Sequence, residues 1–377
     1  MKYEVDIDRF WADDALAHRD NCFSPLAPQA ALGIRMSNEC VFAELGEPGN
    51  EWLDTPGERR IDLNRRYNDL AEKTVGIRLL QEDLPPEDSV FPAVRGIHEI
   101  FGGEYVVAGE SRWLEAVAGT PAELEKVLDR AERIIRGDLR SFMLPEGWDE
   151  TKRRIYEQYG KKPGLFRGIR GPVTLAMSLY GVENLIYLLY DRTELALRFR
   201  DLISDALMGM AGVMDAEAGY TPENRPSGFH FNDDNCCMLT PELYEIFGYP
   251  ILKRAFETYS PAPDDTRFQH SDSAMGHLLP LLGRLDLTGC NFGPTVQVRE
   301  IRKHLPHARI DGQLAPFTFM RNNPEEIIAE VRRDCDQIRE SGARGLNIAT
   351  AGSINGGSSL ESMRVVMHAI QTYGRYE

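Results

Sequence analysis

The sequence predicts an α/β protein built as a (β/α)8 TIM barrel, and two observations support this prediction. Short apolar or β-rich runs alternate with long amphipathic segments along the chain. There are eight such runs, which is the number of strands that a closed barrel requires. A doubly wound open sheet is the alternative fold. The predicted strands are residues 31–36, 75–80, 164–169, 227–232, 266–271, 285–290, 308–313 and 344–349.

The helix starts are the clearest local signals. Thr120-Pro121 offers a capping hydroxyl and a proline at the first helical position, followed by early acids, and Asn323-Pro324 repeats the pattern. Thr240 stands before Pro241 in the same way and is expected to cap a third helix. These three positions therefore predict helices that follow loops.

The organisation of the chain predicts one domain over residues 1–377. No repeat, low-complexity segment or Gly/Ser linker interrupts it. Residues 1–30 are expected to form an N-terminal extension. The interval between the second and third runs is too long for one helix, so residues 85–160 should form an excursion with two helices and the β-rich segment 104–108.

Composition excludes several classes of partner. The chain has 59 acidic and 43 basic residues, for a formal net charge of -16, which argues against nucleic acid and anionic membranes. No apolar run reaches the ~20 residues of a membrane span, and the N-terminus lacks a secretory pattern, so a cytoplasmic protein is expected. The six cysteines have no CxxC spacing and are expected to be reduced. A homodimer is expected from general frequency alone.

Polar residues gather where the predicted strands end, and in a barrel of this kind that edge carries the active site. Each residue there also has a structural explanation, which is the alternative to a functional role. The residues in question are His230, Asp233, Asp234, Asn235, His270, Asp272, Cys290, Asn291, Asp311 and Gln313.

The acids and histidine are the catalytic candidates. Asp233 and Asp234 could act in catalysis or substrate binding, or one of them could order the loop that leads to Thr240. His270 and Asp272 alternate along a strand, so both side chains should lie on one face, as two ligands of one metal or two contacts to one substrate would. A hydrogen-bonded structural role is the alternative for His270.

Other residues are candidates for binding. Cys290 is either a third zinc ligand beside His270 and Asp272 or a small buried apolar residue. Arg35, near the end of the first run, is either salt-bridged or a hook for a substrate carboxylate. The remaining candidates for substrate binding are His230, Asn235, Asn291 and Gln313.

From about residue 160 onward, the chain resembles the uroporphyrinogen decarboxylase-like superfamily. That superfamily contains the decarboxylases of haem synthesis and the zinc-dependent methyltransferases that act on methylated corrinoid proteins. The resemblance implies a single TIM-barrel domain. The motifs that carry it are 168–175 (GIRGPVTL), Asp233-Asp234 with 239–250, 269–272 (QHSD), 312–316 (GQLAP) and the segment from Gly345 through Glu361.

The departures from the family argue against the decarboxylase branch. Only Arg35 matches the Arg-Gln-Ala-Gly-Arg run of the decarboxylases. Leu79-Leu80-Gln81 replaces their Phe-Ser-Asp motif, and Ser178 stands where they carry a tyrosine. Most anchors for the carboxylates of a tetrapyrrole are therefore absent, and haem-pathway decarboxylation is not expected.

The methyltransferase branch matches in part. Those enzymes bind zinc through His-x-Cys and a distant cysteine. Here His270 matches, Asp272 replaces the first cysteine, and Gly352 or Ser353 lies in the region of the second. The resemblance then implies a harder or mixed site that uses His270, Asp272 and either Cys290 or His230.

The leading functional hypothesis is methyl transfer between a small methylated molecule and a corrinoid, with Asp233 or Asp234 and His270 acting on the leaving group. The chain lacks the Asp-x-His-x-x-Gly motif, so the corrinoid would be carried by a partner protein. The alternative is a cofactor-free decarboxylase or lyase, with Arg35 holding a carboxylate and Asp233/Asp234 as an acid–base pair. A non-catalytic binding protein is the third hypothesis.

Overall fold

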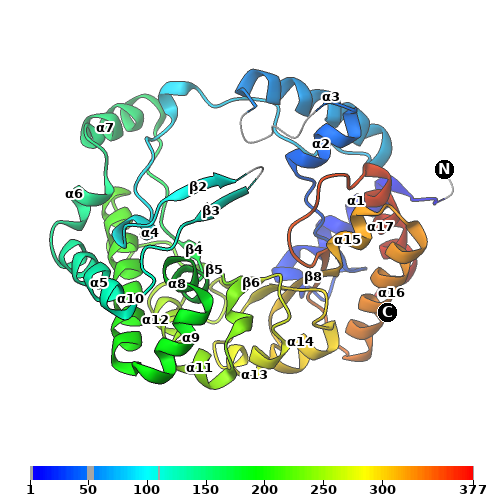
Figure 1. Cartoon of the computed structure of the whole chain (residues 1–377). Helices are drawn as coiled ribbons and strands as arrows, with labels where there is room; N and C mark the ends of the chain where they lie inside the picture. Colours follow the sequence, from blue (N-terminus) through cyan, green and yellow to red (C-terminus); the bar gives the residue numbers. More distant parts are fainter. Residues whose placement is uncertain (1–2, 49–54, 109–110, 377) are drawn as a thin grey trace. The chain divides into compact units, whose positions relative to one another are not determined.

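The structure is a computed structural model that describes residues 3–48, 55–108 and 111–376 (Figure 1). The chain divides into two compact units, Met1–Leu84 with His270–Glu377, and Pro85–Gln269. These are called the first and the second unit below. The single domain over residues 1–377 stays a prediction.

Seven of the eight predicted strands overlap a strand of one sheet, whose order is β1-β9-β8-β7-β6-β5-β4. The pairs β1–β9, β4–β5, β7–β8 and β8–β9 are parallel, and helices alternate with the strands, so the predicted α/β fold class is confirmed. The strands are β1 (Ala31–Leu32), β4 (Gly168–Arg170), β5 (Phe229–Asn232), β6 (Arg267–Ser271), β7 (Gly289–Phe292), β8 (Arg309–Leu314) and β9 (Leu346–Thr350).

The prediction of a strand at residues 75–80 is wrong. Helix α3 (Gly57–Val75) occupies the start of that run and ends at Gly76, whose φ of 86° is left-handed. Beyond it, the Asn68 side chain accepts from the N–H groups of Leu79 (2.8 Å) and Leu80 (2.9 Å) and donates to the Leu80 carbonyl (2.8 Å). A side-chain amide thus takes the backbone bonds that a neighbouring strand would make.

In the first unit, α17 (Leu360–Tyr373) packs on α3 and on α16 (Pro324–Glu340) (Figure 1). The start predicted for α16 is confirmed, because the Asn323 side chain accepts from the N–H groups of Glu325 and Glu326. Within the predicted N-terminal extension, buried Asp14 accepts from the N–H of Leu32 on β1 (2.7 Å). The other helices are α1 (Ile7–Ala17), η1 (Arg19–Cys22), α2 (Asn38–Leu45), η4 (Gly276–Leu278), α13 (Leu279–Gly283), α14 (Val298–His304) and α15 (Pro316–Met320).

In the second unit, the segment expected as an excursion holds helices and an antiparallel hairpin of β2 (Tyr105–Ala108) and β3 (Ser111–Leu114). The start predicted at Thr120 is confirmed by a capping box with Glu123. Thr240 likewise caps α11 (Pro241–Ile246). The other helices are η2 (Glu87–Ser89), α4 (Ile97–Ile100), α5 (Pro121–Arg136), α6 (Leu139–Met143), α7 (Trp148–Tyr159), α8 (Pro172–Tyr180), α9 (Val182–Asp191), α10 (Thr193–Glu217), η3 (Asp234–Met238) and α12 (Gly248–Tyr259).

Among the described residues, no single helix has the length and apolar character needed to cross a membrane. Helices α8 and α9 meet that test only as a pair bent by 101°, and only by length and composition.

Candidate functional site

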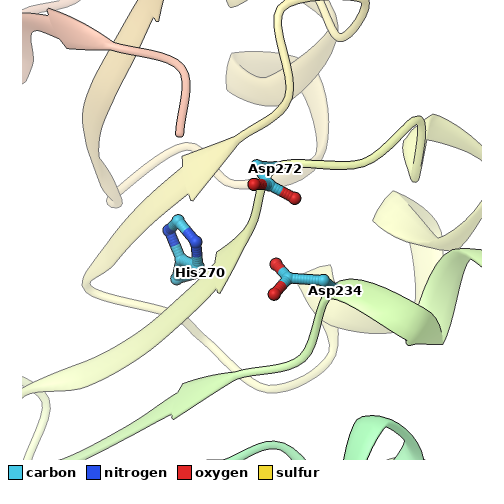
Figure 2. Close-up of side chains that lie close together, drawn as sticks. All are labelled: Asp234, His270 and Asp272. Carbon is cyan, nitrogen blue, oxygen red and sulfur yellow. The ribbon is translucent and has the colours of Figure 1, made fainter. Parts of the chain in front are cut away.

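His270 and Asp272 come together at the carboxyl end of β6, in the first unit (Figure 2). Neighbouring Gln269 and Ser271 are buried, whereas His270 is half-buried and Asp272 is exposed, as strand alternation requires. The ligand atoms of the His270 ring and the Asp272 carboxylate lie within 4.8 Å of each other. This spacing fits two ligands of one metal ion. Figure 2 also labels Asp234, which belongs to the second unit.

The His270 ring is held by Asn291 on β7. His270 Nδ1 lies 2.8 Å from Asn291 Oδ1. Asn291 Nδ2 donates to the backbone carbonyls of Asp311 on β8 and Thr350 on β9, the latter at 3.0 Å. Asn291 was predicted to bind substrate, but the structure places its amide between these protein groups, where it is only 8% exposed.

The next layer of the same polar cluster is centred on the Asp311 carboxylate. Arg309 binds it in bidentate geometry, with Nε 2.7 Å from Oδ1 and Nη2 2.8 Å from Oδ2. Asn347 on β9 donates to Oδ1 at 2.8 Å. The hydrogen bonds to Asp311 raise the pKa of Arg309, so the pair stays charged. Together these contacts fix the position of β8 next to Asn291.

Two glycines shape the position of Asp272. A Cβ at Gly352 would lie 2.7 Å from the Asp272 Cβ, and one at Gly293 would lie 2.5 Å from the Asp272 carbonyl oxygen. Gly352 also has a left-handed φ of 114°. The loops after β7 and β9 therefore approach Asp272 as bare backbone. Gly352, in the region of the family's second zinc cysteine, supplies no donor atom.

Asp233 serves the fold of the second unit. Its side chain is fully buried, and Oδ1 accepts from the Thr174 N–H in the first turn of α8 at 2.7 Å. Burial raises the pKa of this carboxyl to about 6. A Cβ at Gly171 would lie 2.1 Å from the Asp233 Cβ, so only glycine fits there. These contacts favour the loop-ordering interpretation of Asp233 over the catalytic one.

The residues after Asp233 are placed differently. Asp234 is half-buried at the start of η3. Asn235, a predicted substrate-binding residue, donates its backbone N–H to Thr174 Oγ1 at 2.9 Å. Of the two adjacent acids, Asp234 is thus the one that keeps solvent access.

Strand β5 presents a polar face. Phe229 and Phe231 are buried against α12, and His230 and Asn232 alternate with them and lie on the opposite, partly exposed face. The His230 ring lies over Gly168 of β4, where a Cβ would fall 1.8 Å from its Nε2. Burial lowers the pKa of His230, which favours the neutral ring at neutral pH.

Arg170 is a residue of this face that the sequence-based candidates did not include. It pairs in register with Asn232 and is exposed, and its side chain makes no ion pair or hydrogen bond within the described ranges. The signal that could have found it is an arginine that ends a strand directly before the Gly171-Pro172 helix start.

The structure does not support Cys290 as a metal ligand. Cys290 is fully buried, and it precedes Asn291 on β7, so its side chain points to the face opposite the one that contacts His270. Burial raises the pKa of its thiol, which disfavours the thiolate that a metal needs. The geometry favours the alternative, in which Cys290 is a small buried apolar residue.

Gln313 and Arg35, two predicted substrate-binding residues, differ in burial and in contacts. Gln313 is fully buried, and its Nε2 donates to the carbonyls of Gly293 (3.0 Å) and Val296 (2.7 Å), which ties β8 to the loop after β7. Arg35 is exposed beyond the end of β1, and its guanidinium takes part in no ion pair within the described part of the chain. The contacts of Gln313 are structural, whereas Arg35 can meet a ligand.

Comparison with known proteins shows which family and which solved structures this chain resembles. The profile of the family described as Uroporphyrinogen decarboxylase (URO-D) matches residues 149–373. A solved methyltransferase from Methanosarcina mazei is 16% identical, with a TM-score of 0.54 and coverage of 93% of this chain and 95% of that one. A B12-independent methionine synthase from Shewanella sp. W3-18-1, solved with selenomethionine, is 13% identical with a TM-score of 0.37, covering 86% and 88%. No curated protein sequence matches the chain.

Proposed function

The chain belongs to the uroporphyrinogen decarboxylase family, and from this premise we propose that it is a methyltransferase that uses a divalent metal bound at the end of β6. The substrate is a small methylated molecule, and the other reactant is a corrinoid carried by a partner protein. The observation that carries the proposal is the His270–Asp272 pair, with ligand atoms within 4.8 Å. A methyltransferase among the proteins of similar fold is consistent with it.

The donor set fits zinc or another borderline divalent ion. An imidazole and a carboxylate are ligands that zinc accepts, and a pair without thiolates suits an oxygen or nitrogen substrate better than a thiol. When bound, the metal acts as a Lewis acid on the heteroatom that carries the methyl group.

The chain's own residues then divide the work. His270 and Asp272 would hold the metal ion, whose positive charge would stabilise the leaving heteroatom. In the second unit, the exposed Arg170 can bind an anionic group. The methyl–heteroatom bond breaks with its electron pair on the heteroatom. A reduced corrinoid on the partner protein would accept the methyl group and would supply the electron pair for its new bond to carbon. Transfer in the reverse direction uses the same groups.

Elemental analysis tests the metal part of the proposal. We expect near-stoichiometric divalent metal in the wild-type protein, and loss of that metal in His270→Ala and in Asp272→Ala. The control His307→Ala, which alters an exposed histidine after α14, should keep it. Retention of the metal in the two ligand variants contradicts the site.

A spectroscopic assay tests the reaction. Reduced free cobalamin and a panel of O- and N-methylated donors are mixed with the metal-loaded enzyme, and formation of methylcobalamin is followed by absorbance. Methylation with at least one donor, lost in His270→Ala, is the expected result. Absence of methylation across the panel, with free cobalamin and with corrinoid proteins, overturns the methyl-transfer proposal.

A cofactor-free lyase is the second candidate, and exposed Arg35 favours it as an anchor for a substrate carboxylate. The same elemental analysis separates the two proposals. A protein that carries no metal after growth with added zinc, manganese or cobalt points to the lyase.

A further inference from the structure

We propose that Asn291 is a positioning residue that fixes the neutral His270 ring in the tautomer with the proton on Nδ1 and the lone pair on Nε2. The inference rests on the proposed function only for the identity of what Nε2 binds. The assignment of the tautomer itself follows from hydrogen bonds within the first unit.

The orientation of the Asn291 amide is set by two backbone carbonyls. Asn291 Nδ2 donates to the carbonyl of Asp311 and to that of Thr350, 3.0 Å away. A carbonyl oxygen can only accept, so the amide nitrogen must face both of them. The flipped amide would place its oxygen against two other oxygens and lose both bonds. The amide oxygen therefore faces the His270 ring.

The proton of the ring follows from that orientation. Asn291 Oδ1 lies 2.8 Å from His270 Nδ1 and can only accept, so Nδ1 must donate. In the neutral ring the other nitrogen, Nε2, then carries the lone pair. An imidazole without such a partner places its proton mainly on Nε2, and such a ring would have to change tautomer before Nε2 could bind a metal. The hydrogen bond removes that requirement.

The arrangement is rigid because it draws on three strands. Asn291 is 8% exposed on β7, and its two acceptors belong to β8 and β9. The backbone of Asp311 is in turn held through its carboxylate by Arg309 and Asn347. A residue that bound substrate would need at least part of its amide free. In Asn291, both amide hydrogens and the amide oxygen are hydrogen-bonded to protein groups.

Nitrogen-15 NMR of the metal-free protein, labelled at histidine, tests the tautomer directly. At a pH well above the titration of imidazole, we expect the protonated-Nδ1 pattern for His270, assigned by its absence in His270→Gln. In Asn291→Leu, the pattern should change to protonated Nε2 or to a mixture.

Asn347→Ala is the matched control, because it removes a contact to Asp311 in the same cluster and leaves the amide of Asn291 in place. It should keep the wild-type tautomer. A wild-type ring protonated on Nε2, or an unchanged pattern in Asn291→Leu, overturns the proposal. If Asn291→Leu does not fold, the wild-type spectrum decides.

Zinc titration of the apo protein adds a second readout. Loss of a group that orients a ligand histidine weakens metal binding by roughly 10–100-fold, and this is expected for Asn291→Leu. Because the NMR measurement needs no metal, a protein with the expected tautomer but no zinc affinity overturns the metal site of the proposed function and leaves the role of Asn291 standing.

Discussion

The carboxyl ends of β5 and β6 carry similar sequences, an imidazole or amide followed by acids, yet the two ends use their polar groups in different ways. At β6, the contacts of His270 run to Asn291, and Asp272 is exposed. At β5, the Asp233 carboxylate is fully buried and accepts a hydrogen bond from the backbone of α8. The direction of the hydrogen bonds, rather than the residue type, separates a residue that can meet a ligand from one that holds a helix.

The pH dependence of stability is the largest effect expected from this comparison. Burial raises the pKa of Asp233 to about 6, from 3.8 for an unperturbed aspartate. The folded protein therefore binds this proton more tightly than the unfolded chain. The associated stability is fully present below about pH 4 and is lost as the pH rises through about 6, by about 3 kcal/mol in total.

The matched variant for this prediction is Asp233→Asn, which keeps an acceptor for the Thr174 N–H but cannot ionise. Denaturant unfolding of both proteins between pH 4 and pH 7 provides the measurement. The decrease should be present in the wild type and smaller by about 3 kcal/mol in Asp233→Asn. Parallel pH profiles for the two proteins would show that folding does not raise the pKa of Asp233.

The sequence predicted most of the fold because that information is local. Periodicity located seven of the strands, and the capping patterns at Thr120 and Asn323 located helix starts. The strand predicted at residues 75–80 is absent because Asn68, in the preceding helix, makes the hydrogen bonds to the backbone of Leu79 and Leu80. Such a side-chain contact leaves no periodic signal in the sequence.

The site was predicted less completely, for a related reason. Strand ends are readable from the sequence, so His270 and Asp272 were found. The contacts that assign Asn291 and Gln313 to protein groups, and Cys290 to the opposite face of β7, depend on neighbouring strands that are distant in the sequence. Arg170 was missed because a single arginine before a helix start is too common a pattern to identify a site.

Gly352→Ala tests the β6 side of the comparison with an intermediate effect. The added Cβ would meet the Asp272 Cβ at 2.7 Å, and the left-handed φ of 114° disfavours any side chain. We expect a loss of about 2 kcal/mol in the free energy of unfolding and a weaker affinity for zinc, because Asp272 must move.

Gly356→Ala is the control in the same loop, since a Cβ there would meet Glu39 only at an ordinary contact distance of 3.4 Å. It should change neither quantity by more than about 0.5 kcal/mol. An equal loss of stability in both variants, with zinc affinity unchanged, would mean that the loop is sensitive to any substitution and that Gly352 does not position Asp272.

Arg170→Ala tests the β5 side of the comparison and has the smallest expected effect. If the exposed guanidinium binds an anionic group of the donor, its loss should raise KM about tenfold for anionic donors, equivalent to about 1.4 kcal/mol, and leave KM for uncharged donors unchanged. Arg170→Lys keeps the charge without the planar guanidinium, and its KM for anionic donors should lie between those of the wild type and Arg170→Ala. The control Arg153→Ala removes another exposed arginine, on α7. A general change in surface charge would affect both alanine variants equally. A rise in KM confined to Arg170→Ala would therefore identify the polar face of β4 and β5 as the part of the second unit that recognises the substrate, whereas Asp233 holds α8.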